Sequence, residues 1–304
     1  MKVVIFAANG YIGKVLCNYF AERGNEVIAV TRRATVYNEK IINLLWDGKS
    51  QSSNWNNDLE GTHIVINLAG KSVNCRYNDK NKKEIFDSRT FSTEAIGLAI
   101  RNCKNPPGLW INSASATIYR HAEDRPMDEI TGEIGTGFSV EVCKKWEKTF
   151  FGTQTPDTRK VALRMAIVLG DQDGVFVRLK RLAQFGLGGR QGSGKQMFSW
   201  IHDEDICRIV EFIYDNKDLA GVYNASSPNP VTNDQIMSSI RKGMGISFGL
   251  PSPKWLLSIG ALVIGTELEL IFKSRWVVPK KLLDAGFTFN HPTIELAIGN
   301  ILKK

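Results

Sequence analysis

Short apolar runs alternate with amphipathic helical patterns through the first two thirds of the chain. The apolar runs have strand length and few polar breaks, whereas residues 11–23 place their apolar side chains on one helical face. Alternation of this kind is typical of a parallel sheet covered on both faces by helices. Because crossovers between parallel strands are right-handed, we predict an α/β fold with a doubly wound parallel sheet of the Rossmann type. The predicted strands are 3–7, 26–31, 63–69, 109–114 and 160–168, and the predicted helices are 11–23, 79–102, 138–150 and 175–185.

The alternation becomes irregular after residue 185, where a glycine-rich stretch is followed by a short strand over 199–202 and a helix over 203–215. We therefore predict two parts: a Rossmann domain over 1–185, its sheet completed by a strand within 221–226, and a smaller C-terminal α/β lobe over 186–304 with a tail over 250–304. The apolar stretch 255–272 contains two glutamates and is shorter than the ~20 apolar residues of a membrane span. It predicts a buried helix, and we expect no membrane partner.

A glycine turn joins the first predicted strand to the first helix. Its spacing is that of a G-x-x-G-x-x-G motif in which alanine replaces the first glycine. In a dinucleotide-binding turn the glycines allow a tight bend and close backbone approach, and the helix start offers N–H groups to a pyrophosphate. An ordinary strand-to-helix turn is the alternative, but the position after the first strand favours the binding turn. The predicted cofactor-binding residues here are Ala7, Asn9, Gly10, Tyr11, Ile12 and Gly13.

The end of the second strand indicates which dinucleotide is bound. NAD sites place an acidic residue there for the ribose 2′-hydroxyl, whereas this chain has Thr31, Arg32 and Arg33. A guanidinium suits a 2′-phosphate because it offers fixed donors and a full positive charge. We therefore predict NADP as the cofactor, with these three residues near the 2′-phosphate. Two arginines that merely end a strand in water are the alternative.

Composition narrows the class of protein. The chain has 304 residues, 43% hydrophobic and 23% charged, with a net charge of +8 from 39 basic and 31 acidic residues. The basic cluster at 80–83 lies in a predicted helix without a nucleic-acid module, so we expect a solvated face and no nucleic-acid partner. Five scattered cysteines and no export-like segment predict a reducing, cytoplasmic location. Four dispersed histidines suggest no metal site.

Several motifs together resemble a known family. The turn over 7–13, Asn-Leu-Ala-Gly at 67–70, Trp-Glu at 146–147, Leu-Arg-Met-Ala-Ile-Val-Leu-Gly at 163–170, Ser-Trp-Ile-His at 199–202 and the tail at 278–287 are similar to those of atypical extended short-chain dehydrogenase/reductases. Within these, the chain resembles the "epimerase family" oxidoreductases of the YfcH-like and SDR39U1-like branch. The resemblance implies an NADP(H)-binding Rossmann domain and a small substrate lobe. It also implies cofactor contacts from Asn67, Leu68, Ala69, Gly70, Glu84, Arg89 and Arg164; for Arg164, a buried arginine paired with a carboxylate is an equally good interpretation.

The resemblance also suggests where chemistry occurs. In the superfamily a serine polarises the substrate carbonyl, and a tyrosine, helped by a lysine four residues later, transfers the proton. Ser115 and Tyr119 match the segment that carries the serine, and we predict them as the catalytic residues. No tyrosine of this chain has a lysine four positions later; the helix where that pair belongs offers Ser139 and Cys143.

These observations predict an NADP(H)-dependent oxidoreductase that transfers hydride to a small carbonyl or enone substrate. Reduction asks less of the missing base than oxidation does, which favours a reductase. Two alternatives stay open: a non-catalytic NADP(H)-binding sensor or scaffold, and a nucleotide-sugar epimerase or dehydratase with bound NAD. The sequence names no substrate, and a homodimer is an open option.

Overall fold

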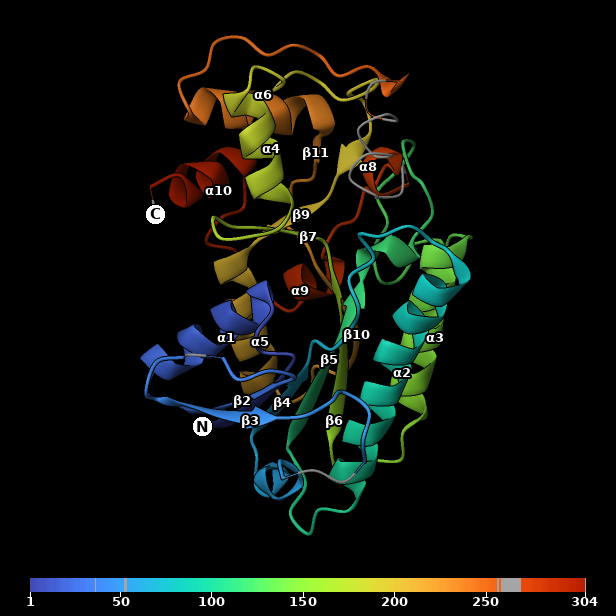
Figure 1. The fold of residues 1–304 in the computed structure, drawn as a ribbon, viewed down its shortest axis with the longest axis vertical. Helices are drawn as coiled ribbons and strands as arrows, with labels where there is room; N and C mark the ends of the chain where they lie inside the picture. Colours follow the sequence, from blue (N-terminus) through green and yellow to red (C-terminus); the bar gives the residue numbers. More distant parts are fainter. Residues whose placement is uncertain (36, 52–53, 256, 258–268, 304) are drawn as a thin grey trace.

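A seven-stranded parallel sheet forms the centre of the larger lobe (Figure 1). The computed structural model describes residues 1–35, 37–51, 54–255, 257 and 269–303. The spatial order of the strands, β10-β6-β5-β4-β1-β2-β3, reverses direction between β1 and β4, as in a doubly wound fold. Their bounds are β10 Gly221–Ala225, β6 Arg159–Met165, β5 Leu109–Ser115, β4 Ile64–Asn67, β1 Lys2–Phe6, β2 Glu26–Thr31 and β3 Ile41–Leu45.

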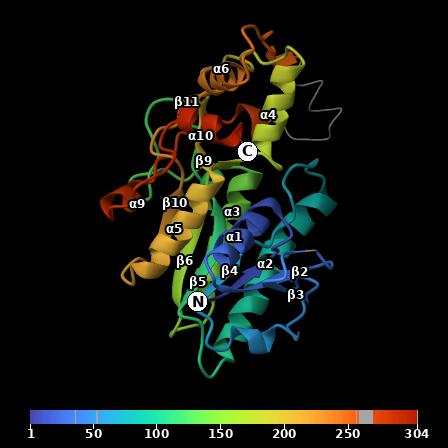
Figure 2. The same cartoon turned by 90° about the vertical axis from the view of Figure 1, so that its left-hand side faces the viewer.

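Helices cover both faces of this sheet (Figures 1 and 2). Helices α1 (Tyr11–Glu22) and α5 (Asp203–Asp215) lie on one face, and α2 (Asp79–Arg101) and α3 (Phe138–Gly152) lie on the other. From Val3 to Phe6, strand β1 is apolar because both of its faces are buried. Val3 and Ile5 belong to the core beneath α1, whereas Val4 and Phe6 belong to the core beneath α2. The predicted α/β class with a doubly wound parallel sheet is confirmed.

The smaller lobe contains helices and short strands packed around a separate core that includes Phe176, Trp200 and Ile236. Its helices are α4 (Val175–Gln184), α6 (Asn233–Gly243) and α10 (Ile294–Ile301), and its paired strands are β7 (Ile167–Leu169) with β9 (Trp200–His202) and β8 (Met197–Phe198) with β11 (Val231–Thr232). Short elements complete the description: η1 (Asn56–Leu59), η2 (Ala116–Ile118), α8 (Glu269–Phe272) and α9 (Lys280–Asp284).

Two details differ from the sequence prediction. The single strand predicted over 160–168 is wrong: β6 ends at Met165, and the chain continues as β7, which pairs with β9 outside the main sheet. The prediction also missed β3, because this edge strand leaves Ile42 and Leu45 half exposed and so lacks a buried apolar run.

The chain crosses between the lobes more than once. Strand β10 pairs with β6 in the main sheet, and α5 packs beside α1, although both follow residue 186 in the sequence. The predicted division at residue 185 stays a prediction. Most of the helix predicted over 255–272 lies outside the described residues. Within the described part of the chain, no helix is both long enough and apolar enough to cross a bilayer.

Candidate cofactor and active site

The glycine turn between β1 and α1 is tight and closely packed. Ala7 adopts a φ of 58°, in the left-handed region that favours glycine, and its carbonyl accepts a hydrogen bond from the Gly10 N–H at 3.1 Å. A Cβ on Gly13 would lie 2.6 Å from the Ala8 backbone, so only glycine lets α1 approach the strand end this closely. Two of the three motif positions therefore have the geometry that the dinucleotide-binding turn requires.

Replacing Ala7 with glycine should stabilise the protein. An alanine in the left-handed region is strained by its Cβ, so we expect Ala7→Gly to raise the free energy of unfolding by about 1 kcal/mol, or roughly 1–2 °C in Tm. Ala21→Gly is the matched control. Ala21 lies within α1, where glycine is unfavourable, so this change should lower the free energy of unfolding by about 1 kcal/mol. Thermal melts of both variants check the signs; a lower Tm for Ala7→Gly would contradict the strain argument.

The start of α1 can receive an anion. Its N-cap is Gly10, which has no side chain to cap the helix, and the first turn contains no acidic residue. The first N–H groups and the positive end of the helix dipole therefore suit a phosphate. Tyr11 reaches across to the start of α5, where its hydroxyl donates to Asp203 Oδ2 at 2.7 Å. Burial and this hydrogen bond raise the pKa of Tyr11 well above its ordinary value.

Arg32 and Arg33 follow β2 and are exposed. Neither guanidinium has an ion-pair partner among the residues that the structure describes. Thr31 is buried instead: its hydroxyl donates to the Arg33 carbonyl at 2.7 Å and accepts from Asn43 Nδ2 at 2.9 Å. Thr31 therefore shapes the loop, and the two arginines are the groups free to meet a phosphate.

The loop after β4 is held by a buried polar network. Asn67 Nδ2 donates to Asn112 Oδ1 at 2.7 Å, and its Oδ1 accepts from the Ala69 N–H at 3.0 Å. The buried Asn67 side chain therefore positions the backbone of Leu68 and Ala69. A Cβ on Gly70 would lie 3.0 Å from the Arg89 guanidinium, so this glycine leaves room for that side chain.

Glu84 and Arg89 both contact the residue that follows this loop. Glu84 pairs with Lys71 Nζ at 2.5 Å on the surface, whereas Arg89 donates to the Lys71 carbonyl at 3.0 Å and lies over the Trp146 ring. Burial lowers the pKa of Arg89. The described residues give Arg89 no carboxylate partner. Both residues lie beside the loop at 67–70, and their contacts with the cofactor stay a prediction.

Arg164 lies in a buried network with a carboxylate. Its guanidinium forms a bidentate pair with Glu147, both distances 2.8 Å, and also donates to the Tyr119 hydroxyl at 2.8 Å. Burial by itself lowers the pKa of Arg164. The hydrogen bonds and electrostatic attraction to Glu147 have the larger combined effect, so the pKa is raised. This geometry supports the alternative interpretation of Arg164 as a buried, paired arginine.

The two predicted catalytic residues have different surroundings. Tyr119 is only 2% exposed and donates its hydroxyl to Asn224 Oδ1 at 3.0 Å, while burial raises its pKa. A substrate has no direct access to a hydroxyl held this way. Ser115 lies at the end of β5, partly exposed, and its Oγ accepts from the Thr117 N–H at 3.2 Å. Its own hydrogen has no acceptor in the described part of the chain, so it can donate to a carbonyl.

A second group of polar side chains lies near this strand end. Tyr77, Ser139 and Glu269 form a chain of hydrogen bonds, and Lys273 Nζ donates to the Thr117 carbonyl at 2.9 Å. Of these four residues, the sequence singles out only Ser139 as a candidate. The residues come from distant segments, and no local motif joins them.

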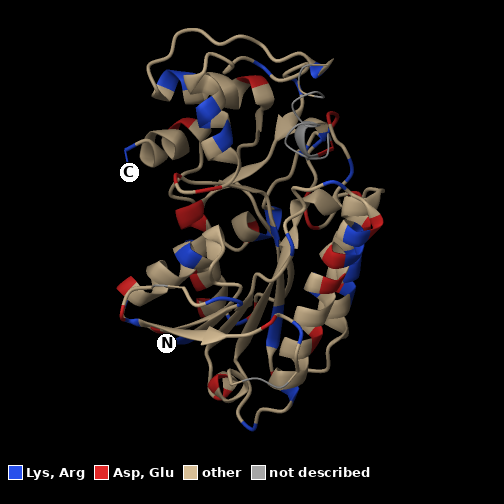
Figure 3. Ribbon diagram, in the orientation of Figure 1, with Lys and Arg blue, Asp and Glu red and all other residues tan. Residues whose placement is uncertain are grey.

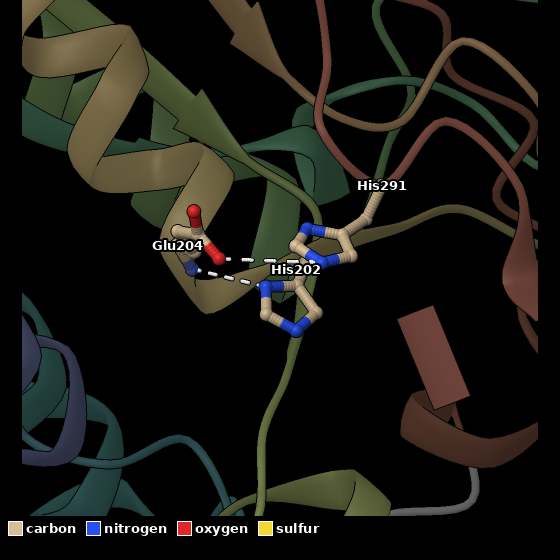
Figure 4. Close-up of side chains that lie close together, drawn as sticks. All are labelled: His202, Glu204 and His291. Atoms are coloured by element: carbon tan, nitrogen blue, oxygen red, sulfur yellow. Dashed lines mark hydrogen bonds and ion pairs between the residues drawn. The ribbon is translucent and has the colours of Figure 1, made fainter. Parts of the chain in front are cut away.

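Figure 4 shows a further cluster at the start of α5, formed by His202, Glu204 and His291. His202 caps the helix by accepting from the Glu204 N–H at 3.1 Å. The imidazole rings of His202 and His291 are stacked, with 3.8 Å between their centroids and 19° between their planes. A metal ion binds in the plane of each imidazole, and two stacked, nearly parallel rings cannot share one ion in this way. The arrangement joins α5 to the tail.

The outer surfaces of α2 and α3 carry both signs of charge (Figure 3). Lys83 pairs with Asp87 along α2, and Lys144 pairs with Glu141 along α3. Mixed charges of this kind fit the solvated face predicted for the cluster at 80–83.

The sheet order and the glycine turn define a Rossmann-type fold of the extended short-chain dehydrogenase/reductase kind. Comparison with known proteins agrees. A model of the "NAD dependent epimerase/dehydratase family" matches residues 3–139, and a domain of unknown function (DUF1731) matches 252–301. The epimerase family protein Mb2239 of Mycobacterium bovis is 30% identical over 300 residues, covering 98% of this chain and 96% of that protein. The chain belongs to this epimerase family.

Solved structures extend the similarity. The human epimerase family protein SDR39U1, crystallised with NADPH, superposes with a TM-score of 0.87 at 26% identity, covering 100% of this chain and 99% of that one. An SDR39U1 homologue of Arabidopsis thaliana, described as chloroplastic, is 26% identical over 307 residues, 100% of this chain and 87% of that protein. The predicted SDR39U1-like branch is confirmed, whereas the cytoplasmic location stays a prediction.

Proposed function

We propose that this protein is an NADP(H)-dependent oxidoreductase that reduces a small carbonyl or enone compound. The observation that carries the proposal is the combination of an uncapped α1 start with two exposed arginines after β2 that form no ion pair with any described residue. The first suits the pyrophosphate of a dinucleotide, and the second suits a 2′-phosphate. The NADPH in the human SDR39U1 structure supports this choice.

Ser115 is the residue we assign to carbonyl polarisation. It ends a central strand at the carboxyl edge of the sheet, where ligands of such folds bind, and its hydroxyl hydrogen is available. Bound NADPH would supply the hydride. The chain's own residues would bind and orient it through the glycine turn, the loop at 67–70 and the two arginines.

The test is NADPH oxidation with a panel of aldehydes, ketones, quinones and enones. Ser115→Ala should lower kcat about 100-fold, the usual effect of removing a hydrogen bond to a developing oxyanion, with the NADPH Kd unchanged. Ser113→Ala is the matched control, because Ser113 lies two residues earlier on the same strand and lines a small apolar void with Ile12 and Leu163. Equal activities of wild type and Ser115→Ala would reject the serine assignment.

The two alternatives give different results. Tight NADPH binding without oxidation by any carbonyl would favour the sensor or scaffold. NAD found by mass spectrometry in protein purified without added nucleotide would favour the epimerase or dehydratase and would contradict the role of Arg32.

A further inference from the structure

The chain of hydrogen bonds that ends at Tyr77 connects solvent with the carboxyl edge of the sheet. Glu269 on α8 is about one-third exposed, and its Oε2 accepts from Ser139 Oγ at 3.2 Å. Ser139 lies in the first turn of α3 and is buried, and its Oγ is 3.3 Å from the Tyr77 hydroxyl. Three separate segments thus meet through two hydrogen bonds.

The direction of these bonds follows from counting hydrogens. A serine hydroxyl has one hydrogen, and a carboxylate can only accept. Because Ser139 donates to Glu269, the bond between Ser139 and Tyr77 must be donated by the Tyr77 hydroxyl. The proton path therefore runs without a break from Tyr77 through Ser139 to Glu269.

Two largely buried arginines, Arg89 and Arg275, lie close enough to Tyr77 for electrostatic attraction. Burial lowers the pKa of Arg89 and of Arg275, and in both cases Coulomb attraction to Tyr77 opposes that shift. Positive charge near a phenol oxygen stabilises the negative charge that remains after it gives up its proton. Tyr77 is also partly exposed, whereas Tyr119, although it accepts a hydrogen bond from Arg164, is buried.

Lys273 ties this chain to the strand end that carries Ser115. Its Nζ donates to the carbonyl of Thr117, two residues after Ser115, and lies 3.8 Å from Glu269 Oε1. The same lysine thus links the turn that follows Ser115 with Glu269, the end of the relay that solvent reaches.

We propose that Tyr77 is the proton donor of the reductase site and that Ser139 and Glu269 form the relay that restores its proton. This inference rests on the proposed function. As the hydride of NADPH adds to the carbonyl carbon, the Tyr77 O–H bond breaks and its proton joins the carbonyl oxygen, giving an alcohol. The phenolate then takes the hydrogen of Ser139, and Ser139 regains one that solvent delivers through Glu269, which ends the cycle as the carboxylate it was at the start.

Kinetics with NADPH and phenanthrenequinone as the carbonyl probe test the donor. We expect Tyr77→Phe to lower kcat by about 100-fold or more, in the range of general acid catalysis, with the NADPH Kd, measured by fluorescence, unchanged. Ser139→Ala should lower kcat less, and Glu269→Gln should change the pH profile of kcat. Tyr214→Phe, on α5 beside Lys217, is the matched control and should behave as wild type.

The relay has a readout that needs no turnover. In protein labelled at tyrosine Cζ, the NMR signal lost in Tyr77→Phe belongs to Tyr77, and it should shift in Ser139→Ala and in Glu269→Gln. A signal unmoved by both variants would overturn the relay. If the wild type turns over and the kcat of Tyr77→Phe lies within about threefold of the wild-type value, Tyr77 is not the proton donor, although the proposed function stands. If the wild type oxidises NADPH with none of the carbonyl compounds in the panel, the proposed function is overturned as well.

Discussion

Glu147→Leu should lower the Tm by roughly 5–8 °C. The change leaves the Arg164 guanidinium, 10% exposed, without its carboxylate. Removing one partner of a buried ion pair costs about 3–5 kcal/mol, because the remaining charge stays buried and uncompensated. The Tyr119 hydroxyl is neutral and accepts one hydrogen bond from Arg164, so it does not replace a carboxylate that accepts two. Thermal unfolding of the purified variant measures the effect.

The double variant Glu147→Leu with Arg164→Met is the control. Replacing both partners with apolar side chains removes the unpaired charge, so we expect it to recover a large part of the lost stability. NADPH binding by Arg164→Met, measured below its Tm, separates the two interpretations of Arg164. An unchanged Kd fits the structural pair, whereas a Kd raised tenfold or more would place this arginine at the cofactor.

Arg32→Ala with Arg33→Ala should raise the Kd for NADPH about 10–100-fold while changing the Kd for NADH less than threefold. A charge-assisted hydrogen bond contributes about 1.5–3 kcal/mol, and only NADPH carries the 2′-phosphate that would receive it. Titration calorimetry with both nucleotides measures the ratio of the two affinities.

Arg23→Ala is the basic control for that experiment. Arg23 ends α1 at the opposite end from the glycine turn, and its guanidinium lies over the Tyr19 ring. Its loss should leave both affinities unchanged. An equal loss of NADPH and NADH affinity in the double variant would show a general electrostatic effect, and no loss at all would remove the argument for NADP.

The parts of the fold that depend on local patterns were predictable. An apolar run such as that of β1 indicates a strand that is buried on both faces. A helix such as α1 shows its buried apolar face as a repeating pattern within 12 residues. The loop around Gly70 was also placed correctly at the strand end. Strand β3 was missed because an exposed edge strand needs no apolar run. The break after Met165 was missed because the Ile167 N–H leaves the main sheet for the Ser199 carbonyl, 32 residues later.

The candidate site was only partly predictable, for a similar reason. The glycine turn and the arginines after β2 act through neighbours in sequence, so spacing reveals them. Tyr77 and Glu269 both contact Ser139, from which they are 62 and 130 residues away in sequence. No local pattern in any of the three segments indicates that they lie together in the fold. The buried state of Tyr119 likewise depends on Asn224 and Arg164, which come from other strands.

The route of the chain between the lobes affects the order of folding during synthesis. The face of the sheet beneath α1 is completed by α5 and, near the end of the chain, by Leu282, Phe287 and Phe289. Until those residues have left the ribosome, the first half of the protein presents an uncovered apolar surface. An uncovered surface of this kind makes a partly synthesised chain prone to aggregation.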